Sequence, residues 1–297
     1  MFSGFWAAQI FFVKLGFIAG AMVLPFQAVL LISATITLTI TLLPKAGSGF
    51  IQLYKEKPAL FWKLFLANGI QSGLGSSLSF VGIAMTDAIN AGFLLKLTAV
   101  TTTLFAWMFL KERMSWIKIF IIITMLSGAY LLSTKGQLLY PKTGDLFILG
   151  ACFCWSLGNV FVRKILKEQT VNADVVTLQK PVAGLPIFLV LFGISAYFPG
   201  KLELLSPVLA CCSFSTQALP YALIGGFCLA GAWIYLYRTL KISTASYLTL
   251  MSMITPVLVS ILAIGFLGER LVWVQIVGAA MILLSGLAIY FSDIVKT

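Results

Sequence analysis

The chain has 297 residues, of which 60% are apolar and only 10% are charged, and its mean hydropathy is +1.04. Soluble globular domains carry about 25% charged residues, so this composition excludes an ordinary soluble protein and indicates that the bilayer is its solvent. The absence of histidine excludes histidine-based catalytic triads and histidine metal sites. Despite a formal net charge of +11, we expect no nucleic-acid partner, because the basic residues lie at the ends of apolar runs and form no patch.

The five cysteines do not form a recognisable metal or redox motif, because none of their spacings is that of a zinc knuckle or a redox CxxC pair. We interpret them as small apolar packing residues. They are Cys152, Cys154, Cys211, Cys212 and Cys228. We therefore expect no catalytic residue, no metal and no cofactor.

Apolar runs between charged and turn-forming clusters predict ten transmembrane helices, since about 20 residues span the hydrocarbon core. They lie near residues 1–14, 22–43, 63–85, 87–110, 116–133, 145–165, 172–197, 218–239, 243–267 and 272–292. The first run is short for a span, and Met1–Phe5 lacks the cation that a signal peptide would carry. We interpret it as a mature helix that lacks a turn, either natively or because the true start lies upstream of Met1.

The basic residues predict the orientation of the helices. With a cytoplasmic amino terminus, thirteen cations fall in the inner connections: Lys45, Lys55, Lys57, Lys63, Lys111, Arg113, Lys118, Arg163, Lys164, Lys167, Arg238, Lys241 and Lys296. Five fall in the outer ones: Lys14, Lys135, Lys142, Lys201 and Arg270. By the positive-inside rule, this bias predicts a multi-pass protein of the inner (plasma) membrane with both termini in the cytoplasm.

The two halves of the sequence resemble each other. Residues 6–14 align with residues 155–163, and residues 109–116 align with residues 266–273, sharing Phe, Leu, Glu, Arg and Trp in the second pair. We expect a first repeat at 1–134, an outer linker at 135–145 and a second repeat at 145–297. Because each repeat has five spans, the second enters the membrane from the opposite side. The predicted fold is an all-α polytopic membrane protein of ten transmembrane helices in two inverted five-helix repeats, an arrangement typical of alternating-access carriers.

A family resemblance rests on these repeated motifs. Each repeat opens with a Trp-containing helix and closes with a helix-end Glu-Arg motif followed by a Ser-Gly-containing span. The motifs are residues 6–14, 82–88, 109–116, 155–164, 255–257 and 268–270. Over essentially the whole chain this pattern resembles the drug/metabolite transporter superfamily, and within it the EamA family of ten-helix bacterial carriers. The resemblance implies export or exchange of amino acids, metabolites or hydrophobic compounds through a central cavity between the halves.

Two lysines lie inside apolar runs. Lys96 is about ten residues from either end of its span, so its ammonium is expected to face a wet cavity or a partner, since a charge at the bilayer centre costs about 2.5–3.5 kcal/mol or more. We predict that Lys96 and its neighbour Thr98 bind a carboxylate or another anion. The alternative is a structural lysine held by backbone carbonyls or by hydroxyls such as those of Thr98 and Thr101. Lys180, closer to a span end, is interpreted as a topological anchor that reaches the interface, with a role in the transport pathway as the alternative.

Aromatic and amide side chains inside the spans are further candidates for substrate contact. An amide in hydrocarbon requires a partner or water, so a position facing a cavity is one interpretation and a hydrogen bond between helices is the other. The candidates are Trp6, Gln9, Gln71, Trp155, Asn159 and Tyr235.

The repeated Glu-Arg pairs, Glu112-Arg113 and Glu269-Arg270, lie at helix ends on opposite sides of the membrane in this topology. We interpret them as interfacial helix-end residues, with a gating contact as the alternative.

The predicted function is therefore an inner-membrane secondary transporter and not an enzyme. Its partners are the lipid bilayer and a small-molecule substrate, most simply an amino acid or a related carboxylate-bearing solute that is exported or exchanged by alternating access. A multidrug exporter of lipophilic compounds is the alternative within transport, and a channel or a lipid scaffold is the alternative outside it.

Overall fold

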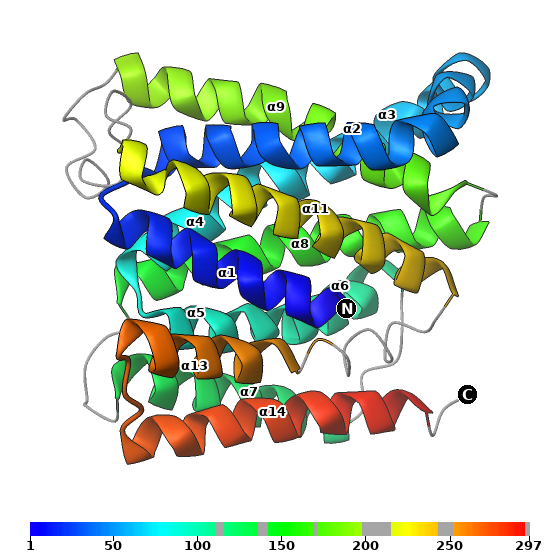
Figure 1. Cartoon of the computed structure of the whole chain (residues 1–297). Helices are drawn as coiled ribbons and strands as arrows, with labels where there is room; N and C mark the ends of the chain where they lie inside the picture. The colour runs from blue at the N-terminus through cyan, green and yellow to red at the C-terminus, as the bar shows by residue number, and fades with distance from the viewer. Residues whose placement is uncertain are drawn as a thin grey trace.

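The computed structural model describes residues 1–110, 116–135, 142–168, 171–197, 215–242, 252 and 254–294. Within these ranges the chain is helical and contains no strand, as the composition predicts. The longer helices lie side by side with nearly parallel or antiparallel axes (Figure 1). Among the described helices, five are long and apolar enough to cross a membrane.

The elements follow the predicted order along the chain. The first half contains α1 (Phe2–Ile18), α2 (Val23–Glu56), α3 (Pro58–Gly69), the π-helical turn η1 (Ile70–Gly75), α4 (Ser76–Met85), α5 (Ala88–Leu94), the 3-10 turn η2 (Leu95–Leu97), α6 (Thr98–Leu110) and α7 (Trp116–Thr134). The second half contains α8 (Thr143–Glu168), α9 (Ala173–Tyr197), the 3-10 turn η3 (Thr216–Ala218), α11 (Leu219–Ile242), α13 (Ile254–Leu267) and α14 (Trp273–Ile294).

Three predicted boundaries in the first half are wrong, and one is the start of the third helix, which was expected at residue 63 but lies at Pro58. The second helix was expected to end at residue 43, but α2 continues through Pro44 to Glu56. A proline removes one backbone hydrogen bond, and the segment after it buries Ala46 and Leu53, which favours continuing the helix. The first helix is also longer than predicted, since α1 passes Lys14 and ends at Ile18. Of the predicted run 243–267, residues 243–251 and 253 lie outside the described residues, and α13 covers the rest from Ile254.

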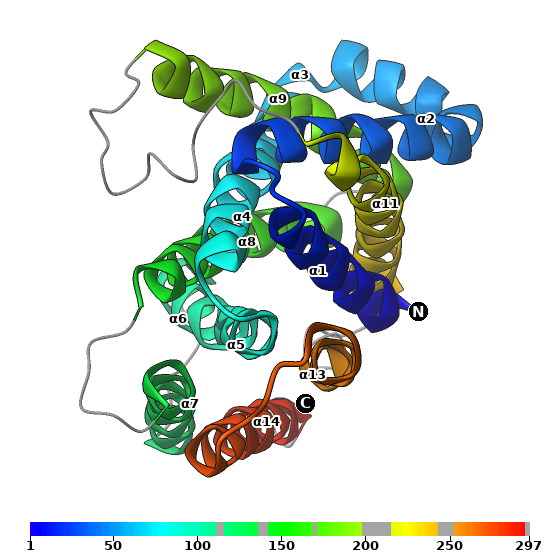
Figure 2. The ribbon, with the colours of Figure 1, turned by 60° about the vertical axis from the view of Figure 1, so that its left-hand side comes forward.

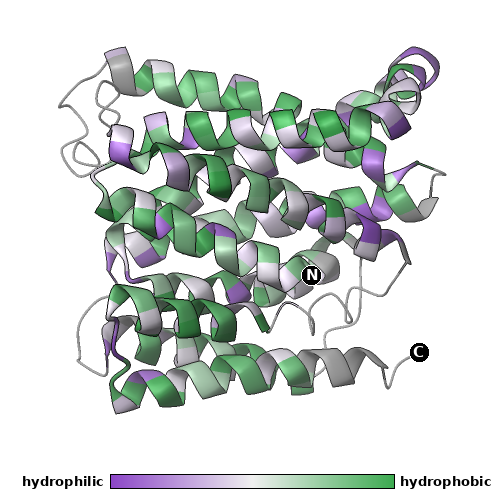
Figure 3. Ribbon diagram, in the orientation of Figure 1, coloured by the Kyte–Doolittle hydropathy of each residue, from purple (hydrophilic) through white to green (hydrophobic). Residues whose placement is uncertain are grey.

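The outer surface of the helices carries many large apolar side chains. On α2, Ile32, Ile36 and Ile40 are four residues apart and 54–70% exposed, while Leu38 on the opposite side is buried. Apolar residues cover the helices along their length, with hydrophilic ones gathered mainly near helix ends (Figure 3). Exposed apolar ridges of this extent are unfavourable in water and favourable in lipid, which identifies a multi-pass membrane protein.

Two helices occupy the middle of the arrangement. Helix α1 packs against α11 and α13, and α8 packs against α4 and α6 (Figure 2). At one side of the molecule α7 and α14 form a close pair, in which a Cβ added to Gly128 would lie only 2.7 Å from the carbonyl oxygen of Gly278.

Candidate functional site

A cavity of about 130 Å³ lies between α1, η1, η2, α6, α8, α9 and α11, with room for several waters or a small solute. Six of the eight substrate-contacting residues predicted from sequence line it: Trp6, Gln71, Lys96, Thr98, Trp155 and Asn159. They come from both halves of the chain, so folding brings together residues up to about 150 positions apart. The lining also includes cations and aromatic rings that the sequence did not single out for this site.

The two irregular turns of the first half each supply a polar side chain to this cavity. Gln71 lies in the π-helical turn η1, and Lys96 lies in the 3-10 turn η2. A π-helical turn displaces carbonyls from the regular ladder, and the carbonyl of Gln71 accepts a hydrogen bond from the indole Nε1 of Trp155 at 2.9 Å. Gly158 permits the close approach, because a Cβ there would lie 2.7 Å from Cδ of Gln71. The irregular backbone thus positions Gln71 against α8.

Lys96 is 6% exposed, and its ammonium has no hydrogen-bond partner among the described residues. The described hydrogen bonds of the two threonines do not include Lys96: the Thr98 hydroxyl donates to the Leu95 carbonyl at 2.7 Å, and that of Thr101 pairs with the hydroxyl of Ser156. The alternative, in which backbone carbonyls or these hydroxyls hold the Lys96 ammonium, is therefore not found among the described hydrogen bonds. The charge faces the cavity instead.

The interpretation of Lys180 as an interfacial anchor is wrong. Its side chain is buried, and its Nζ donates to Oε1 of Gln71 at 2.6 Å and to the hydroxyl of Tyr237 at 3.1 Å. The same Nζ lies 4.8 Å from the ring centroid of Tyr237 and 5.3 Å from that of Trp233. Cation–π attraction and neutral acceptors replace part of the lost hydration, so the lysine need not reach the interface.

Two of the lining residues each have a buried polar atom without a partner among the described residues. These atoms are the amide Nε2 of Gln71, a donor, and Oδ1 of Asn159, an acceptor. A buried polar atom without a partner costs about 1–3 kcal/mol, so a bound solute that pairs with these atoms would recover that free energy.

Aromatic rings complete the lining. Trp6 and Trp155 meet edge to face with centroids 5.6 Å apart, and Phe2 and Trp233 also line the cavity. Arg163 extends the face of α8 that carries Trp155 and Asn159, at the four-residue spacing of a helical stripe. The cavity therefore combines three cations with four rings, and no acidic side chain lies among its described lining residues.

Two predicted contact residues lie away from the cavity. Gln9 is 5% exposed and packs within the helices, and Tyr235 stacks on Phe5 with centroids 5.8 Å apart. Neither side chain lines the cavity.

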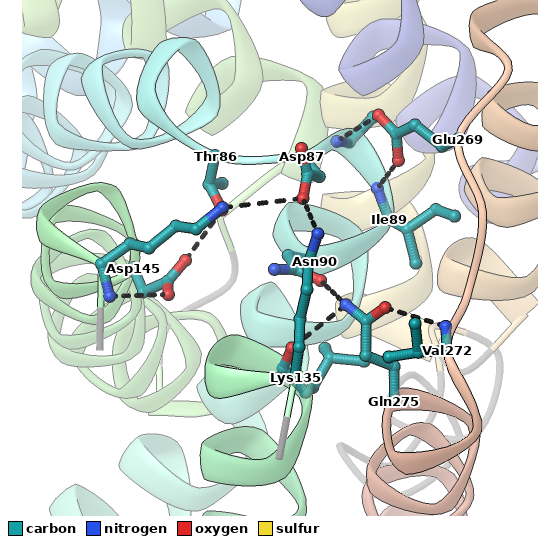
Figure 4. A network of polar contacts seen from close by, with 12 residues as sticks. Thr86, Asp87, Ile89, Asn90, Lys135, Asp145, Glu269, Val272 and Gln275 are labelled. Carbon is teal, nitrogen blue, oxygen red and sulfur yellow. Dashed lines mark hydrogen bonds and ion pairs between the residues drawn. The ribbon is translucent and has the colours of Figure 1, made fainter. Parts of the chain in front are cut away.

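The end of the molecule where α4 meets α5 carries a network of polar contacts, several of which join the two halves (Figure 4). The backbone N–H groups of Ala88 and Ile89 donate to the carboxylate of Glu269 at 2.8 and 3.0 Å. On the other side of the same turn, Lys14 donates to the carbonyls of Ile83 and Thr86. An anion at a helix amino terminus and a cation at a helix carboxyl terminus are both stabilising, so α1 and the second half hold this turn between them.

Further polar contacts lie beside those of Glu269 and Lys14. Nε2 of Gln275 donates to Oδ1 of Asn90 at 3.0 Å, and the carboxylate of Asp87 lies 3.5 Å from the ammonium of Lys135 (Figure 4). Arg270, predicted as a gating or helix-end residue, is exposed. Its counterpart pair Glu112-Arg113 lies outside the described residues.

Comparison with known proteins gives the family. The sequence pattern of the EamA-like transporter family matches residues 2–134 and 142–291. A relative named "Uncharacterized transporter YyaM" from Bacillus subtilis (strain 168) is 30% identical over 100 residues, which are 32% of this chain and 33% of that protein. A crystal structure at 16% identity matches the fold with a TM-score of 0.61, over 98% of this chain and 96% of that one. With nearly its whole length matched, the chain belongs to the EamA-like transporter family, within the drug/metabolite transporter superfamily.

Proposed function

We propose that this transporter moves small carboxylate-bearing solutes, above all amino acids, and that the cavity between α1, α6, α8, α9 and α11 is its substrate site. The observation that carries the proposal is the buried ammonium of Lys96, which faces the cavity with no described partner. An uncompensated ammonium at this depth is costly, and a carboxylate is the group that would offset that cost.

The remaining wall suits the rest of an amino acid. Oδ1 of Asn159 is an unpaired acceptor for an ammonium or hydroxyl, and Nε2 of Gln71 is an unpaired donor for a carboxylate oxygen. The rings of Trp6 and Trp155 provide apolar surface for a side chain. Donors, an acceptor and apolar walls within one cavity are typical of a small-molecule site.

Alternating access would move this site from one membrane face to the other. The contact pattern supports two related halves at 1–134 and 145–297. The first helix of the first half, α1, packs against α11 and α13 of the second, and the first helix of the second half, α8, packs against α4 and α6 of the first. The cavity lining reaches Phe2 and Arg163, while the bonds of Glu269 lie at the opposite end. The basic residues predict an inner-membrane protein with both termini in the cytoplasm. In that orientation the cavity end near Phe2 and Arg163 is the cytoplasmic one, which suits loading of solute for export or exchange.

Glu269 is proposed as the outer gate of this cycle. Its two bonds join the loop after α13 to the first turn of α5, so opening the outer end requires breaking them. In the same topology Glu112-Arg113 would act at the inner face and Arg270 beside Glu269.

A multidrug exporter of lipophilic compounds is the second candidate, favoured by the four rings that line the cavity. The cationic lining disfavours lipophilic cations, because like charges in a cavity of low dielectric repel strongly.

Counterflow in proteoliposomes tests the proposal. The protein would be reconstituted with unlabelled solute inside, and uptake of labelled amino acids or of the lipophilic cation tetraphenylphosphonium would be followed. We expect saturable amino-acid counterflow that Lys96→Gln reduces about tenfold or more, since a hydrogen bond between charged groups is lost. The control is Lys55→Gln, whose side chain is exposed near the end of α2, and it should match the parent. Tetraphenylphosphonium flux that is indifferent to Lys96 would support the multidrug function instead.

A further inference from the structure

The cavity contains a second buried ammonium whose bonding is incomplete. Lys180 has three N–H donors, and the described acceptors use two of them, Oε1 of Gln71 and the Tyr237 hydroxyl. The Tyr237 hydroxyl accepts from Lys180 because its own proton is directed to Oδ1 of Asn68 at 2.8 Å. One donor of Lys180 is therefore left for the cavity that this residue lines.

Neutral groups do not balance this charge. The described contacts of Lys180 are an amide oxygen, a phenol oxygen and two rings, and no carboxylate is among them. Cation–π attraction and neutral acceptors replace only part of the hydration that a buried ammonium loses, since none of these groups carries a negative charge. An anion in the cavity would supply the missing compensation.

Lys96 and Lys180 approach the cavity from different walls. Lys96 follows Leu94 and Leu95, whose carbonyls contact the thiol of Cys152 on α8. Lys180 lies instead against the rings of α11. Neither ammonium has a carboxylate among its described contacts, so each of the two walls carries a cation without an anionic partner.

We propose that the preferred solute carries two acidic groups, one bound by Lys96 and the other by Lys180, as in an acidic amino acid or a related dicarboxylate. Nε2 of Gln71 would donate to the second group, since it lies on the amide that Lys180 already holds and has no described partner. This inference rests on the proposed carrier function and adds a specificity that a single cation would not give.

The test compares solutes that differ only in the second acid. Proteoliposome counterflow would be measured with glutamate against glutamine, and with succinate against its monoamide. We expect the parent to favour each diacid about tenfold or more in apparent affinity, the effect of one added hydrogen-bonded charge pair. Lys180→Gln should lower the apparent affinity for glutamate more than that for glutamine and so reduce this preference to near unity, and Lys55→Gln should leave it unchanged.

The outcomes distinguish the diacid preference from the carrier function. Equal affinity of the parent for glutamate and glutamine, or a preference that survives Lys180→Gln, would overturn the diacid inference and leave the carrier function intact. Absence of counterflow for every carboxylate would overturn both. A structural role of Lys180 alone would lower transport of all solutes together and leave the glutamate-to-glutamine ratio unchanged, which also contradicts the inference. Because the parent's ratio is informative by itself, misfolding of the variant would not remove the test.

Discussion

Replacing Glu269 by glutamine should open the outer end of the transporter. The carboxylate accepts from the N–H groups of Ala88 and Ile89 at 2.8 and 3.0 Å, at the amino terminus of the helix that begins with α5. Hydrogen bonds to a charged group contribute about 1.5–3 kcal/mol, against about 0.5–1.5 for neutral ones. A glutamine has one acceptor oxygen and no charge, and the site is only partly buried, so we take the loss as about 1–2 kcal/mol. That shifts the equilibrium between closed and open outer ends about 5- to 30-fold.

Thiol accessibility measures this shift. Ile89→Cys would be introduced into a background in which the five native cysteines are replaced, because Ile89 is 2% exposed in the closed arrangement. A membrane-impermeant maleimide added to whole cells should then react about 5 to 30 times faster in the Glu269→Gln variant. Glu56→Gln is the matched control, since it makes the same change at an exposed carboxylate at the end of α2, whose described hydrogen bonds are to Gln52 on the same helix. Equal labelling rates in Glu269→Gln and the parent, or a larger increase in the control, would refute the reasoning.

Three further predictions concern the walls of the cavity and the helix pairs. Gly158→Ala should abolish counterflow but not membrane insertion, since a Cβ there would lie 2.7 Å from Cδ of Gln71 and displace that amide; Gly4→Ala, with open space around it, should transport as the parent does. Trp155→Phe keeps a ring but loses the 2.9 Å bond to the Gln71 carbonyl, so the KM of counterflow should rise about threefold to tenfold. Gly128→Ala should lower the free energy of unfolding by about 1–3 kcal/mol, because the α7–α14 contact leaves no space for a Cβ, and thermal unfolding in detergent would show a lower midpoint.

Each of these predictions has a contradicting result. Full counterflow in Gly158→Ala would mean that the position of Gln71 is irrelevant to transport. An unchanged KM in Trp155→Phe would mean that the indole bond does not hold the π-helical turn in place, and an unchanged melting midpoint in Gly128→Ala would mean that the α7–α14 pair separates at little cost.

Helix positions and polar outliers could be predicted from the sequence because hydropathy and charge act locally. The apolar runs predicted most of the helices, and the rarity of polar groups in lipid identified Lys96, Gln71 and Asn159 as unusual. These three side chains line one cavity in the structure. A polar residue in a membrane helix is costly wherever it points outward, so most such residues gather inside.

The rotation of each helix could not be predicted, because it depends on packing against distant helices. Gln9 shares a helical face with Trp6 by spacing, yet only Trp6 lines the cavity. Tyr235 turns toward Phe5 of α1, whereas Trp233 on the same helix faces the cavity. Lys180 was misread because its distance from the span end allowed it to reach the interface, and the acceptors that hold it lie on other helices.

One missed residue had a signal in the sequence. Arg163 follows Trp155 and Asn159 at intervals of four, which places all three on one stripe of α8. The π-helical turn around Gln71 had a weaker signal, the glycine-rich stretch at 69–75, which predicts close backbone approach but not the change in helical winding.

The central claim, that this cavity binds the transported solute, is tested most directly by substrate protection. Ala99 lines the cavity and has a small side chain, so Ala99→Cys in a background lacking the native cysteines would place a thiol in its wall. The account predicts that glutamate slows the reaction of this thiol with a maleimide, with half-maximal protection near the concentration that half-saturates counterflow, and that tetraphenylphosphonium gives no protection. A reaction rate unaffected by saturating glutamate, in protein that still exchanges glutamate, would contradict the claim and place the site elsewhere.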